Sequence, residues 1–472
     1  MSDVLFESAL VQAGMLRRGE ISSRELVALH FARIEQVNPA LNAIVTTTPE
    51  LALEQAAAAD AAHARGESVG VLHGLPIAHK DLVATKGIRT TMGSAIFADQ
   101  VPASDALIVR RERAAGAVTI GKTNVPEFGA GSQTFNEVFG VTANPYDRTK
   151  TCGGSSGGAA VALATGMTAL ADGSDMGGSL RNPAAFCNVV GLRPSPGRVP
   201  SWPKDAAWTH LSTEGPMGRT VEDVALLLSA IAGPDPRSPI ALERPGSDFS
   251  PPIQVDPAGL RVAWSPDLGG LPVDSTVLTA LARVPDIFEG LRCVVAEDVP
   301  DLAGAREIFQ VRRAWNYEAS LGAVYDQRGD EMKDTVRWNI EEARRLSMVD
   351  HARAASRHAQ LYQRVCAFFE RYDALVCPVT QVPPFDINAP YITDIEGVPL
   401  DTYIDWMRSC TDVTVMGCPA ISVPGGFTED GLPVGLQIIG PPRDDLAVLG
   451  IAHAFELVTR FGDRRPGIPG DG

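Results

Sequence analysis

Residues 152–194 read CGGSSGGAAVALATGMTALADGSDMGGSLRNPAAFCNVVGLRP and contain two clusters of glycine and serine, 153–158 (GGSSGG) and 175–179 (DMGGS). Between the clusters, 159–164 is expected to form a helix and 168–171 a strand that leads into the second cluster. An isolated run of this kind is typical of a surface turn. Two runs joined by a helix and a strand suit a backbone that approaches a ligand closely or adopts positive φ, which glycine permits.

Short apolar runs on both sides of this stretch predict buried strands. They occupy 75–78, 117–120, 374–377, 420–423 and 434–439. Helices are predicted between them, the first with capping-box spacing at Ser22 and Glu25. The other predicted helical stretches are 51–64, 221–232 and about 303–370. This alternation of buried strands with helices predicts an α/β protein.

The composition indicates a globular protein with a substantial core, because 45% of the 472 residues are hydrophobic and 21% are charged. The formal net charge of −16 disfavours nucleic acid and anionic membranes as partners. Four arginine pairs are isolated in the sequence, so we expect them to be solvated surface positions. These pairs are Arg110-Arg111, Arg312-Arg313, Arg344-Arg345 and Arg464-Arg465.

The seven cysteines are scattered, odd in number and without a C-x-x-C pair, which favours reduced thiols in a cytoplasmic protein. The N-terminus lacks the basic region of a signal peptide, and no apolar run reaches 18 residues. We therefore expect neither secretion nor a membrane span. The eight histidines show no zinc-type spacing, so no metal and no cofactor are expected.

The first cluster allows two interpretations by pattern alone. A phosphate-binding loop requires Lys and then Ser or Thr after the glycines, whereas Ala159-Ala160 follow here, so that interpretation fails. The spacing Gly153-x-Ser155-x-Gly157 also matches the nucleophile elbow of α/β-hydrolases. An elbow directly follows a buried strand, and the polar, turn-like residues 144–150 do not predict one.

A longer set of motifs resembles the amidase signature family and covers nearly the whole chain apart from about 236–370. The motifs are LHGLP (72–76), KD (80–81), GKTN (121–124), NPYD (144–147), the two clusters, LRNP (180–183), GLRP (191–194), EGPM (214–217), RT (219–220), CPAISVP (418–424) and DGLPVGLQ (430–437). The resemblance implies the family's fold, a mixed β-sheet core flanked by helices on both faces. It also implies a single domain over 1–472, with a core signature region at about 70–225. The rest of this domain consists of a variable, helical, substrate-shaping region at about 236–370 and a return to the core at about 371–460.

Carried over by position, the family's catalytic lysine is Lys80, its bridging serine is Ser155 and its nucleophile is Ser179. The resemblance also implies a cis peptide bond between Gly154 and Ser155. One departure from the family is Cys152, where many relatives have proline. Lys80 must be neutral to accept a proton, so we expect it to be buried, because burial lowers the pKa of lysine.

The second cluster and its surroundings supply the expected supporting groups. Backbone N–H groups of Met176, Gly177, Gly178 and Ser179 are expected to form an oxyanion hole. Gly129 is expected to line the acyl pocket, and Ser132 and Asn136 to hydrogen-bond to the site. Ser156 is expected to bond either the lysine or its own loop, and Asp175 and Arg181 to pair with each other as scaffold. His79 is expected to be structural.

These residues predict a hydrolase of amide-type C–N bonds that acts on small or aryl amides, with possible activity on esters and carbamates (urethanes). The expected partner is a small-molecule amide or carbamate, and the expected assembly is a monomer or homodimer. Two alternatives stay open. One is the amidase-like component of a tRNA-dependent amidotransferase, and the other is an α/β-hydrolase esterase that uses Ser155.

Overall fold

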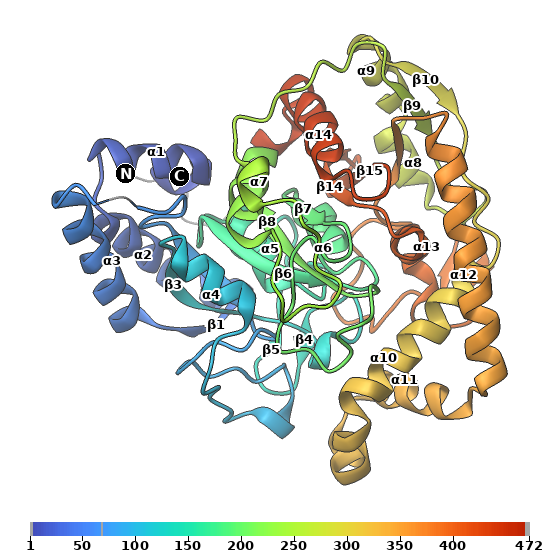
Figure 1. Cartoon of the computed structure of the whole chain (residues 1–472), viewed down its shortest axis with the longest axis horizontal. Coiled ribbons are helices and arrows are strands. Elements are labelled where there is room, and N and C mark those ends of the chain that lie inside the picture. The colour runs from blue at the N-terminus through green and yellow to red at the C-terminus, as the bar shows by residue number, and fades with distance from the viewer. Residues whose placement is uncertain (1–2, 68, 468–472) are drawn as a thin grey trace.

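One sheet of 11 strands lies at the centre of the computed structural model, which describes residues 3–67 and 69–467 (Figure 1). Met1 and Ser2, part of the N-terminal stretch considered above, lie outside the described residues. The strand order is β1-β3-β2-β6-β8-β7-β14-β15-β11-β9-β10. The strands are β1 (Ile44–Thr47), β2 (Pro76–Lys80), β3 (Val118–Thr123), β6 (Leu170–Asp175), β7 (Val190–Arg193), β8 (Thr213–Gly218), β9 (Arg261–Trp264), β10 (Val294–Glu297), β11 (Ala374–Pro378), β14 (Ala420–Phe427) and β15 (Pro433–Ile439).

The sheet is mixed, as the family resemblance predicted. β2 runs parallel to both of its neighbours, β3 and β6, and β9 runs parallel to β10 and β11. The other pairs within the sheet are antiparallel. Two separate hairpins pair β4 (Phe135–Asn136) with β5 (Gly140–Val141) and β12 (Asp394–Ile395) with β13 (Val398–Pro399).

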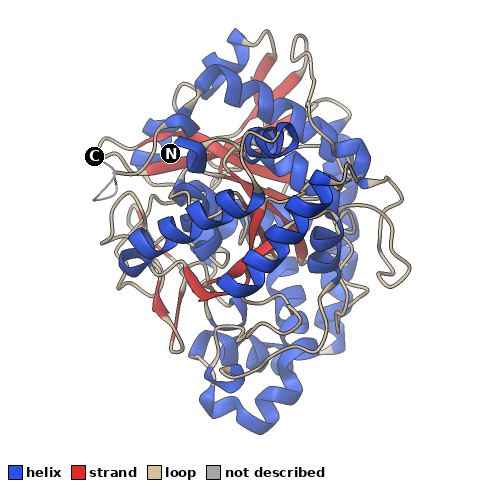
Figure 2. Cartoon of the chain, turned by 90° about the vertical axis from the view of Figure 1, so that its left-hand side faces the viewer, coloured by secondary structure: helices blue, strands red, loops and turns tan. Residues whose placement is uncertain are grey.

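Helices cover both faces of this sheet (Figure 2). The α-helices are α1 (Ala9–Arg18), α2 (Ser23–Leu41), α3 (Pro49–Ala64), α4 (Leu107–Ala114), α5 (Gly157–Ala164), α6 (Arg181–Cys187), α7 (Val221–Ile231), α8 (Ser275–Leu281), α9 (Val284–Gly290), α10 (Ala305–Arg328), α11 (Asp334–Arg345), α12 (Met348–Phe369), α13 (Arg408–Met416) and α14 (Asp445–Thr459). Short 3₁₀ turns lie at Asp3–Phe6, Ala95–Phe97, Glu127–Gly129, Gly246–Phe249, Gly329–Glu331, Asp405–Met407 and Phe461–Asp463.

The two-sided cover follows from the alternation of side chains along each strand, since successive residues point to opposite faces. Ile77 of β2 and Leu170 of β6 join one core cluster, which includes residues of α4, α7 and α14. Their neighbours Ala78 and Ala171 join a second cluster with α5 and α6 on the other face. Both strands are therefore buried on both sides, and the charged residue at the end of β2 is carried into the interior.

The predicted helices form where their end signals lie. Ser22 caps α2 through a complete capping box, in which its Oγ accepts from Glu25 N–H and its N–H donates to the Glu25 carboxylate. The predicted helical stretch at about 303–370 is occupied by α10, α11 and α12, at the lower right of Figure 1. Within the described residues, no helix is both long enough and apolar enough to cross a membrane.

Candidate active site

Lys80 is the last residue of β2, and its side chain is completely buried. Its Nζ lies 2.9 Å from Ser155 Oγ and 3.0 Å from Ser174 Oγ. Its backbone N–H donates to Asp172 Oδ1 at 2.8 Å, which ties the end of β2 to the neighbouring β6. The strand pairing therefore brings the amine of Lys80 to Ser155, the residue expected from the family resemblance to bridge it to the nucleophile.

Burial lowers the pKa of Lys80 to about 7, although the carboxylates of Asp175 and Asp172 act to raise it. An ordinary lysine has a pKa of about 10.4 and is almost entirely protonated at neutral pH. With the lowered pKa, a large share of Lys80 is neutral near pH 7 and able to accept a proton.

Ser155 sits in a loop whose backbone is fixed by neighbouring hydroxyls. The Gly154–Ser155 peptide bond is cis, as the resemblance implied. Ser132 Oγ donates to Gly154 O at 2.8 Å, and Thr134 Oγ1 donates to Gly153 O at 2.8 Å. Ser132 thus acts on the loop that presents Ser155.

Gly129 also borders Ser155. Its φ of +69° is in the left-handed region, and a Cβ there would lie 3.0 Å from Leu82 Cδ1 and 3.4 Å from Ser155 Oγ. A side chain at this position would therefore crowd the bridging hydroxyl.

Ser179 lies in the short loop between β6 and α6, and it lines a cavity of about 260 Å³ together with Ser155 and Gly129. Its carbonyl oxygen accepts from Ser156 N–H at 3.1 Å, so the two glycine-serine clusters are in direct contact. The structure brings Lys80, Ser155 and Ser179 into one place although they lie on three separate segments.

Asp175 organises the loop that carries Ser179. Its carboxylate accepts from the backbone N–H groups of Gly178 and Leu180, and from Arg181 Nε and Nη2 at 3.0 and 2.9 Å. Arg193 adds a contact at 3.3 Å. Although burial opposes it, this arginine pair holds the pKa of Asp175 well below its ordinary value. Asp175 and Arg181 thus pair as scaffold.

The backbone donors around Ser179 are only partly available for an oxyanion. Gly178 N–H donates to Asp175 Oδ1 at 2.9 Å, so one of the four N–H groups that were predicted to form the oxyanion hole is not free. The N–H groups of Met176, Gly177 and Ser179 make no hydrogen bond within the described part of the chain. Gly178 has a different reason to be glycine, since its φ is +110° and a Cβ would lie 2.7 Å from the Asn182 amide.

Two of the expected supporting contacts are not made. Ser156 Oγ is buried and bonds neither the lysine nor its own loop among the described residues. Asn136 donates instead to Asn124 Oδ1 and Val125 O, and it does not line the cavity of Ser179. Two contacts were not anticipated, Ser174 with Lys80 and Arg193 with Asp175. The GLRP motif was a signal for the arginine, whereas Ser174 had none.

Arg313 corrects the expectation that the arginine pairs are solvated. Its side chain is 4% exposed, because α10 crosses over the loop of Ser179 and directs the residue into the cavity wall. The crossing is close, since a Cβ on Gly177 would lie 3.1 Å from Phe309 of α10. The apolar part of the wall comes from Leu82, Met92, Phe128 and Leu321, and the polar part includes Lys204, Ser212, Asn316 and Tyr317.

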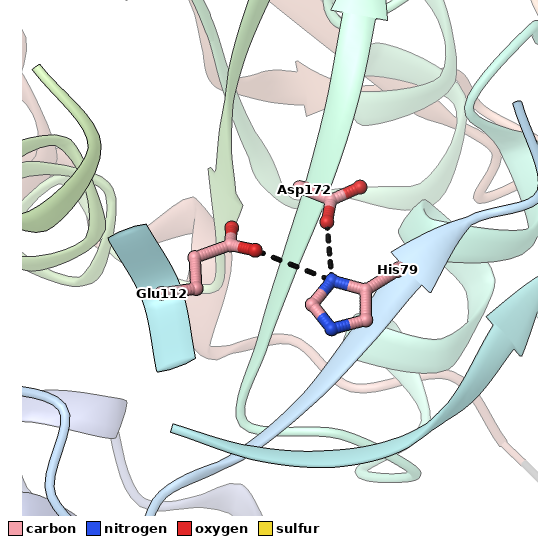
Figure 3. A group of neighbouring side chains, drawn as sticks. All are labelled: His79, Glu112 and Asp172. Atoms are coloured by element: carbon pink, nitrogen blue, oxygen red, sulfur yellow. Dashed lines mark hydrogen bonds and ion pairs between the residues drawn. The ribbon is translucent and has the colours of Figure 1, made fainter. Parts of the chain in front are cut away.

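His79, which directly precedes Lys80 in β2, forms a buried cluster with Asp172 and Glu112 (Figure 3). Its Nδ1 lies 2.6 Å from Asp172 Oδ2 and 3.2 Å from Glu112 Oε2. Burial alone would lower the pKa of His79, but the Asp172 carboxylate raises it to about 9. Two ligands of one tetrahedral ion would lie about 3.3 Å apart, given metal–ligand bonds of about 2.0 Å. The closer contact favours a shared proton over a metal, and it fixes the carboxylate that holds the Lys80 backbone.

Comparisons with known proteins agree over the length of the chain. The amidase family model matches residues 25–449. The chain is 36% identical to an acylamidase of Rhodococcus erythropolis, with 97% of each chain covered. It is 37% identical to the A component of the glutamyl-tRNA(Gln) amidotransferase of Moorella thermoacetica, with 96% of each chain covered. The solved structure of a bacterial aryl acylamidase of the amidase signature family superposes with a TM-score of 0.91 at 28% identity, covering 98% of this chain and 99% of that one.

Proposed function

This chain belongs to the amidase signature family, and we propose that it hydrolyses amide bonds of small or aryl substrates through an acyl-enzyme on Ser179. The observation that carries the proposal is the 2.9 Å contact between Lys80 Nζ and Ser155 Oγ, in the wall of the cavity that Ser179 lines. A buried amine with a pKa of about 7 is suited to take a proton from a hydroxyl at neutral pH.

In the first half-reaction, Ser155 passes its proton to Lys80 Nζ while it accepts the proton of Ser179 Oγ. The freed oxygen attacks the carbonyl carbon, and the carbonyl electron pair moves to oxygen. Free N–H groups of Met176, Gly177 and Ser179 are the candidates to bond this oxyanion, and one such donor is typically worth about 10²–10³ in rate.

When the tetrahedral intermediate collapses, the C–N bond breaks and the proton returns from Lys80 through Ser155 to the leaving nitrogen. Water then enters and gives a proton back along the same path. The resulting hydroxide attacks the acyl-enzyme, the acid leaves, and Ser179 regains its proton. Lys80 is neutral at the start of each half-reaction and protonated in between.

The substrate range is proposed from the size and lining of the cavity. A volume of about 260 Å³ lies just below that of typical small-molecule pockets, about 300–1,000 Å³. Leu82, Met92, Phe128 and Leu321 give it an apolar side that suits an aryl ring. Anilides and carbamates also have better leaving groups than alkyl amides, so we include carbamates (urethanes) and esters in the proposed range.

A role as the amidase-like component of a tRNA-dependent amidotransferase is the second candidate, favoured by the identity to the Moorella thermoacetica protein. The net charge of −16 counts against direct contact with tRNA, although a partner could supply that surface. We propose instead that the chain acts alone in the cytoplasm as a monomer or homodimer. Gel filtration combined with a glutaminase assay separates the two roles.

The elbow alternative for Ser155 receives no support from the geometry. Ser155 Oγ contacts Lys80, and none of the described residues that line the cavity is histidine. An elbow requires a buried strand directly before the glycines, whereas Cys152, which precedes them here, belongs to a loop.

Labelling with a fluorophosphonate, followed by mapping of the adduct by mass spectrometry, tests the assignment of the nucleophile. We expect the adduct on Ser179 in wild type and its loss in Ser179→Ala, with Ser229→Ala, on α7, as a matched control. An adduct on Ser155 would support the elbow. A panel of anilides, alkyl amides, carbamates and esters then defines the range, and no turnover of any member would contradict the proposal.

A further inference from the structure

Arg313 is a buried cation whose contacts are all neutral. Its Nε donates to Asn339 Oδ1 at 2.9 Å, and its Nη2 donates to the hydroxyls of Tyr403 at 2.7 Å and Tyr317 at 3.3 Å. Its Nη1 contacts only Met176 Sδ, at 3.7 Å, and a thioether is a weak acceptor. Two N–H bonds of a guanidinium are thus left without an oxygen partner beside the loop of Ser179.

Three other buried arginines are each paired with a carboxylate. Arg181 and Arg193 meet Asp175 at 2.9 and 3.3 Å, and Arg198 meets Asp445 at 3.0 Å. For Arg313, no carboxylate of the described residues lies within 4.0 Å. Burying a charge is costly unless it is paired. The ring centroids of Tyr317 and Tyr403, 4.8 and 5.7 Å from Arg313 Cζ, offset part of this cost, but they supply no oxygen acceptor to Nη1.

The cavity that Arg313 lines also has positive side chains without a carboxylate to balance them. Lys204 also lines it, and its Nζ donates to Ser212 O at 3.0 Å. Among the described residues of the lining, none is Asp or Glu. Glu214 acts on Lys204 from outside the cavity. The space next to the nucleophile is therefore positive, within a protein of net charge −16.

We propose that the substrate carries a carboxylate, which binds Arg313 Nη1 at the wall of the cavity while Ser179 attacks the amide carbon. This inference rests on the proposed amidase function and specifies its substrate class. A carboxylate would supply the oxygen acceptors that Nη1 lacks, in charge-assisted hydrogen bonds that are about twice as strong as neutral ones. Lys204 adds a second, weaker attraction.

The contact with Met176 limits where the carboxylate sits. Met176 lies in the same loop as the nucleophile, three residues before Ser179, so the acid group must be a few bonds from the amide. It belongs either to the acyl part, as in a dicarboxylic acid monoamide, or to the amine part, as in an N-acylaminobenzoate. Hydrolysis then releases a diacid or an amino acid, respectively.

Two pairs of isosteric substrates test the proposal with the intact enzyme. For the acyl part, glutaric acid mono-4-nitroanilide is compared with 5-methylhexanoic 4-nitroanilide. For the amine part, 4-acetamidobenzoate is compared with 4-isopropylacetanilide. A hydrogen bond to a charged group contributes about 1.5–3 kcal/mol, so wild type should prefer one of the acids by roughly 10- to 100-fold in kcat/KM.

Arg313→Gln is expected to abolish this preference, because it should lower kcat/KM for the acid, mainly through KM, roughly 10- to 100-fold more than for the neutral member of the pair. Arg312→Gln is the matched control, because it removes the same charge from the adjacent position, which does not line the cavity. The control should keep the preference. If Arg313→Gln fails to fold, as judged by circular dichroism, the single variant Lys204→Met, which keeps Arg313, should still reduce the preference for the acidic substrate.

Equal efficiency of wild type on both members of both pairs would overturn the proposal and leave the amidase function standing. An equal loss on acidic and neutral substrates in Arg313→Gln would also overturn it, because that result marks Arg313 as scaffold between α10 and α11. Absence of turnover for all four compounds, together with an unlabelled Ser179, would count against the proposed function itself.

Discussion

Lowering the pH is expected to remove activity as Lys80 becomes protonated, since only the neutral amine accepts the proton of the hydroxyl pair. With a pKa of about 7, roughly half of Lys80 is neutral at pH 7 and about 1% at pH 5. Accordingly, kcat/KM should fall about 50-fold between these two values and level off above about pH 8. A lysine with an ordinary pKa of about 10.4 would instead give kcat/KM that rises about tenfold per pH unit through pH 9.

Lys80→Met removes the proton acceptor while keeping a long apolar chain, and it should lower kcat by about 10²–10⁴. Lys122→Met is the matched control. Lys122 is equally buried on the neighbouring β3, and burial lowers its pKa to about 8. Its Nζ bonds Val83 O and Thr85 Oγ1, away from the cavity, so this variant should keep the acid limb of the profile.

The assay is the release of 4-nitroaniline from an anilide that the enzyme accepts, followed by absorbance from pH 5 to 9.5 at constant ionic strength. Circular dichroism at each pH, and recovery of activity after return to pH 7.5, separate titration from acid unfolding. Full activity at pH 5 would refute the reasoning. Near-wild-type activity of Lys80→Met at neutral pH would refute it as well.

Three further outcomes follow from the same geometry. Lys80→Met should raise Tm at pH 7, because the pKa of Lys80 is about 7 in the native state and about 10.5 in the unfolded chain, so protonation of Lys80 favours unfolding at that pH. Calorimetry should show this gain in Tm shrinking toward pH 10, where the unfolded chain also loses the proton. Arg181→Gln should cost about 3 kcal/mol of unfolding free energy in urea titrations, since it leaves Asp175 undercompensated. Gly178→Ala should lower kcat at least tenfold through its 2.7 Å clash, whereas Gly87→Ala, also at positive φ but in open space, should keep kcat.

The sequence predicts those parts of the molecule whose signals are local. The capping box of Ser22, the buried strand before Lys80 and the two glycine-serine clusters could all be read from short stretches, because propensity and periodicity act over a few residues. The family resemblance added the mixed sheet and the cis bond before Ser155.

Features that depend on distant packing could not be read in this way. The sequence indicated a solvated Arg313, whereas the residue is buried because α10 packs against the loop of Ser179. Likewise, the use of Gly178 N–H by Asp175 depends on how the carboxylate is turned by two arginines. The order of the strands is also set by long-range pairing, as when β14 inserts between β7 and β15.

Because α10 packs against the loop of Ser179, two distant stretches of the chain contribute to the cavity. One stretch of 100 residues contains Lys80, Ser155 and Ser179. Arg313 and Tyr317 reach the cavity from α10, which packs against α11, α12 and α13. The proposed reacting groups and the part of the cavity wall that carries Arg313 therefore belong to separate stretches of the chain. We expect that exchanging α10 and α11 between relatives changes the preference for acidic amides and leaves the positions of Lys80, Ser155 and Ser179 unchanged.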